Sequence, residues 1–279
     1  MSAMRPLISC LCCASDARSD AYREICEGIF HQPPRFHRKQ WENVYILHML
    51  REAGVLEIGK RGLGFGCGRE ILVPAFAALG CEVLATDQDA ESTAASGWIE
   101  TSQHSSSLTD FAVYLPRVCS EADFLGRVRH RTVDMNGIPP DLLNGDYDFA
   151  WSCCSLDHLG SLRNGLEFIK QSIRCVRPGG FVVHTTEFNV SSDEQTVESK
   201  GLSIYRTRDL LAFEREVGAD GHRMYPLDLH SGSQEEDRHL DRPPYPGNDD
   251  GVHLHLEIEG FDVTSVGILI QRGEAETKQ

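Results

Sequence analysis

The sequence predicts an α/β fold with a doubly wound, mostly parallel sheet that helices cover on both faces. Between residues 36 and 190, short apolar runs alternate with amphipathic helical patterns, which is typical of βαβ units. A glycine-rich stretch at 62–68, GLGFGCG, joins the first predicted strand to a helical pattern, where such sheets let a ligand approach the backbone. Near the end of the chain, apolar runs flank Glu259 and Gly260, which predicts an antiparallel hairpin.

The length of 279 residues and the apolar content of 41% suit one large domain with appendages. We expect an N-terminal arm at 1–35 and a main domain at 36–279. The formal net charge of −15 disfavours nucleic-acid binding, which draws on clustered lysine and arginine. No apolar run reaches the roughly 18 residues of a membrane span, and the first residues make a poor signal peptide, so we expect a cytoplasmic protein. The ten cysteines are interpreted as reduced, mostly buried thiols, and no feature indicates an oligomeric state.

The predicted elements follow in chain order. The first helix covers FHRKQWENVYILHMLREAGVL, where Val44, Leu47 and Leu50 form one apolar stripe. Strands are predicted at RGLGFG, EVLATD, RHRTVD, YDFAWSCC and GFVVHTTE. Helices are predicted at REILVPAFAALG, LRNGLEFIKQSIRCV and TRDLLAFEREVG. A polar loop rich in proline and glycine at about 228–251 is long enough to be a lid or a substrate-binding loop.

The glycine stretch distinguishes two classes of cofactor. The dinucleotide fingerprint G-x-G-x-x-G fails at its last position from either start, because Cys67 and Arg69 stand where glycine is needed. The strict alternation of Gly64, Gly66 and Gly68 instead resembles the first motif of class I S-adenosylmethionine-dependent methyltransferases. On this resemblance, the three glycines let the methionine part of the cofactor lie against the loop backbone.

Further motifs extend the resemblance over residues 36–190 and the hairpin, and imply the seven-stranded sheet of that family. Asp87, 19 positions after Gly68, would accept both ribose hydroxyls. Asp134 and Met135, in TVDMNGIP, would meet the adenine amino group and the adenine ring. DYDFAWSCCSLDHLGSL resembles the fourth-strand motif, and CVRPGGFVVHTTE carries the Pro-Gly-Gly turn before the fifth strand.

The sequence departs from the family pattern at two places. The acidic residue that commonly stands two positions before the first glycine, and helps hold the methionine ammonium, is replaced by Gly62. The 47 positions from Asp87 to Asp134 exceed one helix and a turn, and this insertion is a candidate wall of the cofactor or substrate site. Arg38 and Arg69 are candidates for the methionine carboxylate, and the alternative for both is a surface charge. Trp41, which begins the first helix, either closes over the cofactor or is a core anchor.

Methyl transfer mainly requires alignment of the nucleophile, and a hydroxyl nucleophile gains from a base. His158 is the first candidate for that base, with Asp157 as its orienting partner or a substrate contact; the alternative is a helix cap and a packing histidine. His184 and Glu187 end the fifth predicted strand. One of them, in the first place Glu187, is a candidate for binding a sugar hydroxyl or acting as the base, and the alternative is a structural hydrogen bond.

A metal ion is not favoured, and no metal ligand is assigned. His253 and His255 share one strand face, but Mg²⁺ prefers oxygen ligands, and no dense carboxylate cluster is visible beyond QEEDRHLD. Magnesium therefore remains only an option.

A narrower resemblance of GLGFGCGRE, VHTTEFN and DRPPY to bacterial methyltransferases of cell-surface glycan biosynthesis implies the acceptor class. We expect O-methylation of a sugar hydroxyl on a glycan precursor or sugar nucleotide. The alternatives are O- or N-methylation of another small molecule, a methyltransferase-like binding protein without catalysis, and an NAD-dependent oxidoreductase.

Overall fold

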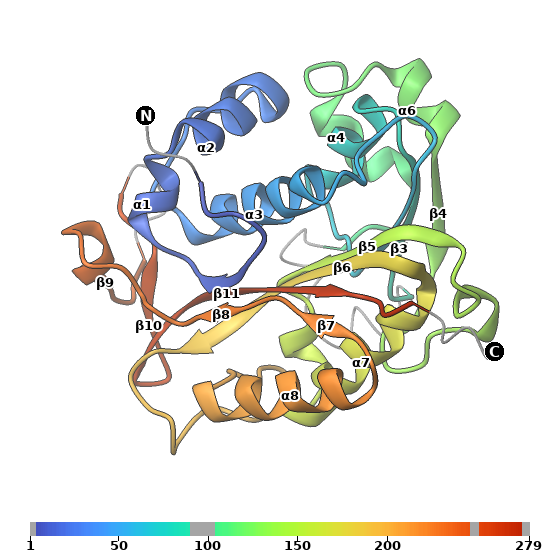
Figure 1. Cartoon of the computed structure of the whole chain (residues 1–279). Helices are drawn as coiled ribbons and strands as arrows, with labels where there is room; N and C mark the ends of the chain where they lie inside the picture. Colours follow the sequence, from blue (N-terminus) through green and yellow to red (C-terminus); the bar gives the residue numbers. More distant parts are fainter. Residues whose placement is uncertain (1–3, 90–103, 246–250, 275–279) are drawn as a thin grey trace.

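A twisted sheet runs through the molecule with helices on both faces, in a computed structural model that describes residues 4–89, 104–245 and 251–274 (Figure 1). The central strands are parallel and lie in the order β4-β3-β2-β5-β6. Their bounds are Arg61–Phe65 (β2), Glu82–Asp87 (β3), Val128–Thr132 (β4), Tyr147–Cys153 (β5) and Val176–Asn189 (β6). The chain builds outward from β2 to β4 and then resumes at β5 on the other side. The gap between the ends of β2 and β5 is therefore a topological switch point, where such sheets bind ligands.

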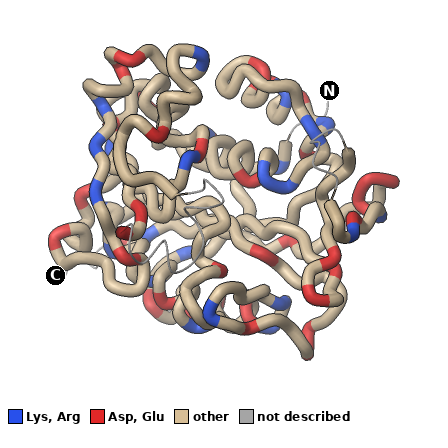
Figure 2. Tube along the Cα trace, turned by 180° about the vertical axis from the view of Figure 1, so that it is seen from behind, with Lys and Arg blue, Asp and Glu red and all other residues tan. Residues whose placement is uncertain are grey.

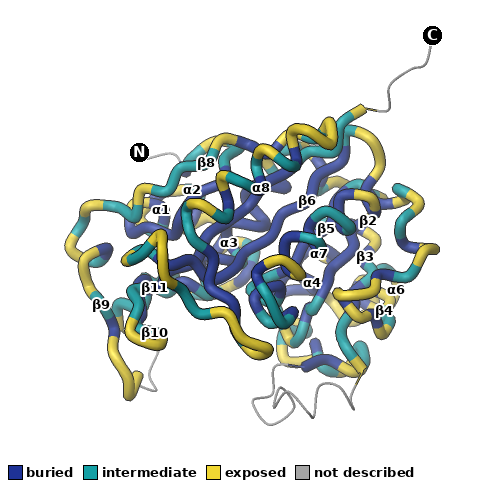
Figure 3. The backbone as a smooth tube through the Cα atoms, turned by 90° about the horizontal axis from the view of Figure 1, so that it is seen from below, coloured by how far each residue is buried: buried dark blue, intermediate teal, exposed yellow. Residues whose placement is uncertain are grey.

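The helices divide between the two faces and enclose a separate core on each. The main α-helices of the described residues are Arg38–Glu52 (α3), Leu72–Ala78 (α4), Glu121–Arg127 (α6), Leu162–Cys175 (α7) and Thr207–Ala219 (α8). Figure 1 shows α3, α4 and α6 over one face and α7 and α8 over the other. The aromatic rings of Phe149 and Trp151 lie in the first core, whereas Ala150 between them lies in the second. The central strands β2, β5 and β6 are thus mostly buried, and Figure 3 shows β6 in dark blue, whereas the edge strand β4 is only partly buried.

The C-terminal hairpin is confirmed. Strands β10 (His255–Ile258) and β11 (Phe261–Gln271) are antiparallel, and the turn between them uses positive φ at Glu259 (51°) and Gly260 (82°). Strand β11 also pairs antiparallel with β6, from Val263 to Gln271.

The predicted seven-stranded sheet is extended by further strands at the edge beyond β11. The far side of β11 is covered by three short pieces, namely β10, β1 (Ser9–Leu11) and β7 (Arg223–Met224). Strands β8 (Leu227–Asp228) and β9 (Leu240–Asp241) extend the edge further, so the sheet of the described residues has eleven strands around the seven-stranded frame.

The N-terminal segment is part of the sheet and of one core, where the sequence indicated only an arm. After β1, helices α1 (Ala14–Ala17) and α2 (Asp20–Glu24) and a π-helix at Ile25–Phe30 cover the outer side of α3. Helix α3 is therefore buried on nearly all sides, and not along one stripe as predicted.

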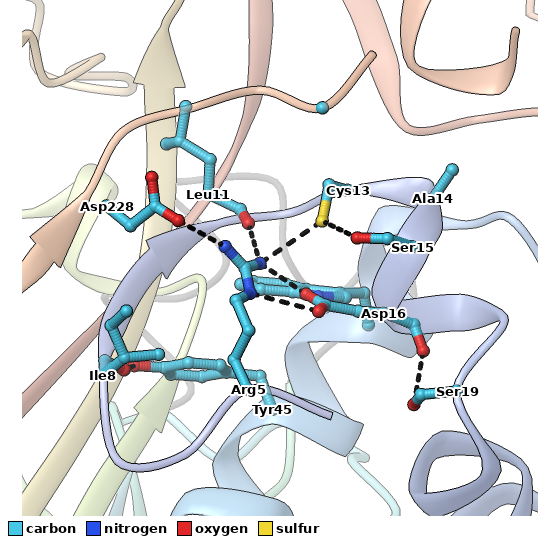
Figure 4. A network of polar contacts seen from close by, with 12 residues as sticks. Arg5, Ile8, Leu11, Cys13, Ala14, Ser15, Asp16, Ser19, Tyr45 and Asp228 are labelled. Carbon is cyan, nitrogen blue, oxygen red and sulfur yellow. Dashed lines mark hydrogen bonds and ion pairs between the residues drawn. The ribbon is translucent and has the colours of Figure 1, made fainter. Parts of the chain in front are cut away.

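A buried ion pair ties this segment to its neighbours. Figure 4 shows the Arg5 guanidinium, whose Nη2 lies 2.5 Å from Asp16 Oδ2 and 2.7 Å from the Leu11 carbonyl oxygen. Trp41 Nε1 donates to the same carboxylate at 2.8 Å. Trp41 is thus a core anchor with a satisfied indole, and the expectation that it closes over the cofactor is not supported.

Part of the predicted lid contacts the N-terminal segment. In its described part, Asp237 accepts a hydrogen bond from the Ala14 backbone at 2.6 Å, and Glu236 pairs with Arg18. Acidic positions such as these are spread along the whole trace and lie among the basic ones (Figure 2).

Candidate functional site

A cavity of about 410 Å³ opens at the carboxyl ends of β2, β3 and β5 and is closed on one side by α3. Its walls come from the glycine loop, the strand ends and the insertion after β3. The lining residues used below are Lys39, Glu42, Gly66, Gly68, Arg69, Glu70, Asp87, His104, Met135, Cys154 and His158. The position is the one that the topology predicts for a ligand.

Only the second half of the glycine loop faces this cavity. Gly66 and Gly68 line it with φ values of 57° and 51°, a region that favours glycine. A Cβ at Gly66 would lie 2.8 Å from Ser155 across the cavity mouth. The conformation and the crowding both require glycine here.

Glycine is required at positions 62 and 64 for a different reason, which corrects the expected role of Gly64 in cofactor binding. Gly64 is buried and does not line the cavity, and a Cβ there would lie 2.4 Å from Cys67 Sγ and 2.5 Å from the Trp151 ring. A Cβ at Gly62 would lie 2.4 Å from the Phe149 ring. These two glycines make room for protein aromatic rings, and Phe149 excludes the acidic side chain that the family carries at position 62.

Asp87 is oriented before any ligand arrives. Its Oδ2 accepts hydrogen bonds from the Gly68 and Ser105 amides, both at 3.0 Å, and its Oδ1 accepts one from Gln88 N at 2.8 Å. His104 Nε2 lies 2.9 Å from the Gln88 carbonyl oxygen. The insertion after β3 thus supplies a wall of the cavity through His104 and Ser105; its residues 90–103, which include Trp98, lie outside the described part.

Asp134 and Met135 both follow β4, but their side chains have different surroundings. Met135 is buried and lines the cavity. Asp134 is exposed, does not line the cavity, and accepts a hydrogen bond from Asn136 N at 2.8 Å. Met135 is placed to pack against a ring, whereas Asp134 would have to turn inward to reach one.

Arg38 does not reach the cavity, and its neighbour does. Arg38 is buried and its Nη1 lies 2.7 Å from Glu187 Oε1 and 3.4 Å from Glu42 Oε1. Lys39 lines the cavity, with its Nζ 3.3 Å from Glu42 Oε1. The expected contact of Arg38 with the methionine carboxylate is therefore not supported, because a buried carboxylate already holds its guanidinium.

Glu187 lies behind the cavity wall in this charged cluster. Burial would raise the pKa of its carboxyl, but Arg38 and Lys39 hold that pKa below its usual range. Cys154 Sγ donates to its Oε1 at 3.3 Å. Glu187 is therefore an ionised anchor for Arg38, and its Oε2 has no hydrogen-bond partner among the described residues.

His158 and Asp157 form a close pair at the cavity edge. Nε2 of His158 lies 3.1 Å from Asp157 Oδ2, and Nδ1 lies 2.6 Å from the Gly201 carbonyl oxygen. Because a carbonyl only accepts, Nδ1 donates to it, and Nε2 is the nitrogen that faces Asp157. Burial raises the pKa of the Asp157 carboxyl, in line with a protonated or proton-sharing acid. His158 can serve as a base only after Nε2 leaves Asp157.

His184 is a structural residue in this geometry, which corrects its candidacy as a catalytic group. It is fully buried beneath the sheet end, with Nδ1 2.8 Å from Ser152 Oγ and Nε2 2.9 Å from Ser172 Oγ. Burial lowers the pKa of its imidazole to about 3. Neither ring nitrogen faces the cavity.

Two groups of residues come into question as metal ligands, namely the late histidines and a cluster beside the cavity. His253 and His255 each bind a different carboxylate, Asp241 at 2.7 Å and Asp262 at 2.8 Å. Among the described residues, the cluster with metal-ligand spacing is Cys154, Asp157 and Glu187. Arg38 already neutralises Glu187, and burial raises the pKa of the Cys154 thiol well above its usual value. A cation would have to displace both the guanidinium and the thiol proton.

The sequence did not indicate a cavity role for three charged residues that line it: Lys39, Glu42 and Glu70. Glu42 lies one helical turn after Arg38, so the helical period could have found it. Glu70 lies in the quoted loop, but its contact with Trp151 Nε1, at 2.6 Å, joins positions far apart in the chain. No sequence pattern predicts that contact.

The strand order, the switch-point cavity and the C-terminal hairpin define a class I, Rossmann-like α/β protein. The model of a family described as a methyltransferase domain matches residues 37–228, most of the chain, and the chain belongs to that family. The family implies S-adenosylmethionine as the methyl donor. No curated protein matches the sequence.

Solved structures with the same fold have diverse activities. The chain is similar to a candidate sarcosine dimethylglycine methyltransferase from Galdieria sulphuraria, with 12% identity, a TM-score of 0.53, and 83% of this chain and 85% of that chain covered. It is also similar to the [4+2]-cyclase SpnF, with 17% identity, a TM-score of 0.51, and 83% and 82% covered. At these identities the likeness shows the fold alone. No helix in the described ranges is long and apolar enough to cross a membrane.

Proposed function

We propose that the protein transfers the methyl group of S-adenosylmethionine to a hydroxyl of a small polar acceptor, most specifically a sugar of a glycan precursor or sugar nucleotide. The observation that carries the proposal is the cavity at the switch point, with Gly66, Gly68, Asp87 and Met135 on its walls. The sugar acceptor is supported by the narrower sequence resemblance.

The cofactor would extend along the strand ends. Met135 follows β4, and its apolar side chain suits the face of the adenine ring. Asp87 ends β3, and a carboxylate at this place suits the two ribose hydroxyls. Gly66 and Gly68 follow β2 and allow the chain of the cofactor to lie close to the backbone. The methionine end would then lie between the loop, α3 and the end of β5.

The residues at the far end of the cavity would align the acceptor and take its proton. His158 and Cys154 line the cavity there, and the buried pair of Asp157 and Glu187 lies directly behind them. Methyl transfer is an in-line displacement, so positioning supplies much of the rate and a base adds to it. We propose that the acceptor displaces His158 Nε2 from Asp157 and thereby frees it to accept the hydroxyl proton.

One alternative has a specific observation in its favour. The [4+2]-cyclase SpnF shares the fold, so a methyltransferase fold does not by itself require methyl transfer. Occupied His158 nitrogens would also suit a protein of this fold that binds the cofactor without using it. An NAD-dependent oxidoreductase is disfavoured by the broken dinucleotide fingerprint.

Calorimetric titration with S-adenosylmethionine, S-adenosylhomocysteine and NAD, each with and without Mg²⁺, tests the proposal. Binding of the first two without a magnesium requirement is the expected result. Incubation with sugar nucleotides and S-adenosylmethionine, read by mass spectrometry for a gain of one methyl group, then tests the acceptor. Binding of NAD alone would contradict the cofactor assignment, and methylation of phenols or amines but not sugars would contradict the acceptor.

A further inference from the structure

Every described carboxyl group that lines the cavity, except one, has a cation or backbone amide donors beside it. The carboxyl groups that line it are Glu42, Glu70 and Asp87. Glu42 lies within 3.4 Å of Arg38 and Lys39, and Asp87 is bound by backbone amides. Glu70 forms no ion pair among the described residues.

Glu70 is nevertheless held firmly in place. Trp151 Nε1 donates to its Oε1 at 2.6 Å, and Gly64 provides the space in which the Trp151 ring lies. Trp151 itself is fully buried against Phe76 of α4, with ring centroids 4.9 Å apart. A neutral donor from a fixed ring orients the Glu70 carboxyl on the cavity wall without neutralising it.

The place of Glu70 matches one end of the proposed cofactor. Met135 follows β4, Asp87 ends β3 and Glu70 reaches β5, so these three side chains follow the order of the strands. Adenine, ribose and the amino-acid end follow one another in the same order in S-adenosylmethionine. The amino-acid end brings an ammonium group to the side where the unneutralised carboxyl lies.

We propose that Glu70 binds the α-ammonium of the methionine end of S-adenosylmethionine. The inference rests on the proposed function and names the group that recognises one part of the cofactor. Position 62 cannot supply this carboxylate, because Phe149 occupies the space beside it. Glu70 supplies it from the other end of the glycine loop.

The burial of Glu70 adds a second readout. Burial raises the pKa of its carboxyl to about 8, so below that pH the empty site holds a neutral acid. An ammonium group favours the carboxylate, so cofactor binding releases the proton of Glu70. Affinity for the amino-acid end therefore falls as the pH is lowered from 8, at most about tenfold for each pH unit.

The test compares two ligands in the wild type and in Glu70→Gln. S-adenosylhomocysteine carries the ammonium, whereas 5′-methylthioadenosine has the same nucleoside without the amino acid. Glutamine keeps an oxygen for Trp151 Nε1 but removes the charge. We expect Glu70→Gln to weaken S-adenosylhomocysteine binding about tenfold or more and to change methylthioadenosine binding less than about twofold. The fall of S-adenosylhomocysteine affinity between pH 8 and 6.5 should also disappear in the variant.

Glu57→Gln is the matched control, because Glu57 is an exposed carboxyl that precedes β2, whereas Glu70 follows it. In this variant, the affinities for both ligands should stay at their wild-type values. Equal losses of affinity for both ligands in Glu70→Gln would indicate a structural role of Glu70. An unchanged affinity for S-adenosylhomocysteine would mean that another group binds the ammonium. Either result overturns the assignment of Glu70. If the wild type binds neither ligand, the proposed function fails together with this inference. Wild-type binding of both ligands keeps the two failures apart.

Discussion

His158 and His184 both lie near the ends of strands in the sequence, but their surroundings give them different chemistry. His158 lines the cavity, and its Nε2 lies 3.1 Å from Asp157 Oδ2. His184 lies between two serine hydroxyls inside the core. The residue type alone made both of them catalytic candidates, and the contacts of their ring nitrogens separate them.

Replacement of His158 by alanine tests its role as a base. We expect kcat to fall about tenfold or more, because general-base catalysis usually contributes about 10² or more. The Kd for S-adenosylhomocysteine should stay within about twofold. His31→Asn, which removes an exposed imidazole of the N-terminal segment outside the cavity, is the control and should leave both constants unchanged. Wild-type kcat in His158→Ala would remove this residue from the mechanism.

His184 predicts a pH dependence of stability. Its folded-state pKa of about 3 lies below the unfolded value near 6.5, so the unfolded chain binds a proton that the folded chain does not. The free energy of unfolding should therefore decrease as the pH falls below 6.5, by about 1.4 kcal/mol per unit from this group. Urea unfolding of the wild type and His184→Gln at pH 7, 6 and 5 measures the difference in slope. Parallel slopes would show that His184 is charged in the folded state.

At the scale of elements, the sheet could be predicted because each strand and helix has its own periodic pattern. Helices α3, α7 and α8 and the hairpin at Glu259 and Gly260 were visible in this way. The glycine stretch was located correctly, but the reason for Gly62 and Gly64 was not, because it lies in rings from the neighbouring strand β5. Which of Arg38 and Lys39 enters the cavity likewise depends on the partner Glu187, which lies far away in the sequence.

The packing of Phe149 against Gly62 can be tested directly. A Cβ at position 62 would lie 2.4 Å from a buried ring that also packs on Phe76, so Gly62→Ala should destabilise the protein by about 1–3 kcal/mol. Gly28→Ala is a matched control, because nothing lies within 4 Å of a Cβ built there. The midpoints of urea unfolding give the comparison. Equal midpoints for the two variants would mean that the Phe149 ring moves aside without cost, and that position 62 could hold a larger side chain.

At the scale of the whole molecule, the N-terminal segment and the C-terminal strand complete one sheet. Strand β1 pairs with β11 and β8, which come from the last fifth of the chain. Patterns within a short window cannot reveal such pairings, and the three residues of β1 are too few for a strand signal. The first 35 residues therefore read as an arm in the sequence, although their described part helps to bury α3.

The ion pair of Arg5 and Asp16 provides the test of this integration. Asp16 is 3% exposed and also accepts the Trp41 indole proton, so removal of Arg5 leaves a buried carboxylate without its cation. We expect Arg5→Ala to lower the free energy of unfolding by about 3 kcal/mol. Arg23→Ala, which breaks an exposed pair with Asp20, should cost less than about 1 kcal/mol.

Unfolding followed by two probes shows whether the N-terminal segment unfolds together with the sheet. If the segment belongs to one cooperative unit with the sheet, Trp fluorescence, to which Trp41 beside Asp16 contributes together with the other two tryptophans of the chain, and far-ultraviolet circular dichroism should give the same midpoint in both variants. An earlier fluorescence transition in Arg5→Ala, with the circular dichroism midpoint unchanged, would instead mean that the segment detaches alone. The segment would then be a separate unfolding unit, although its strand β1 pairs with the sheet.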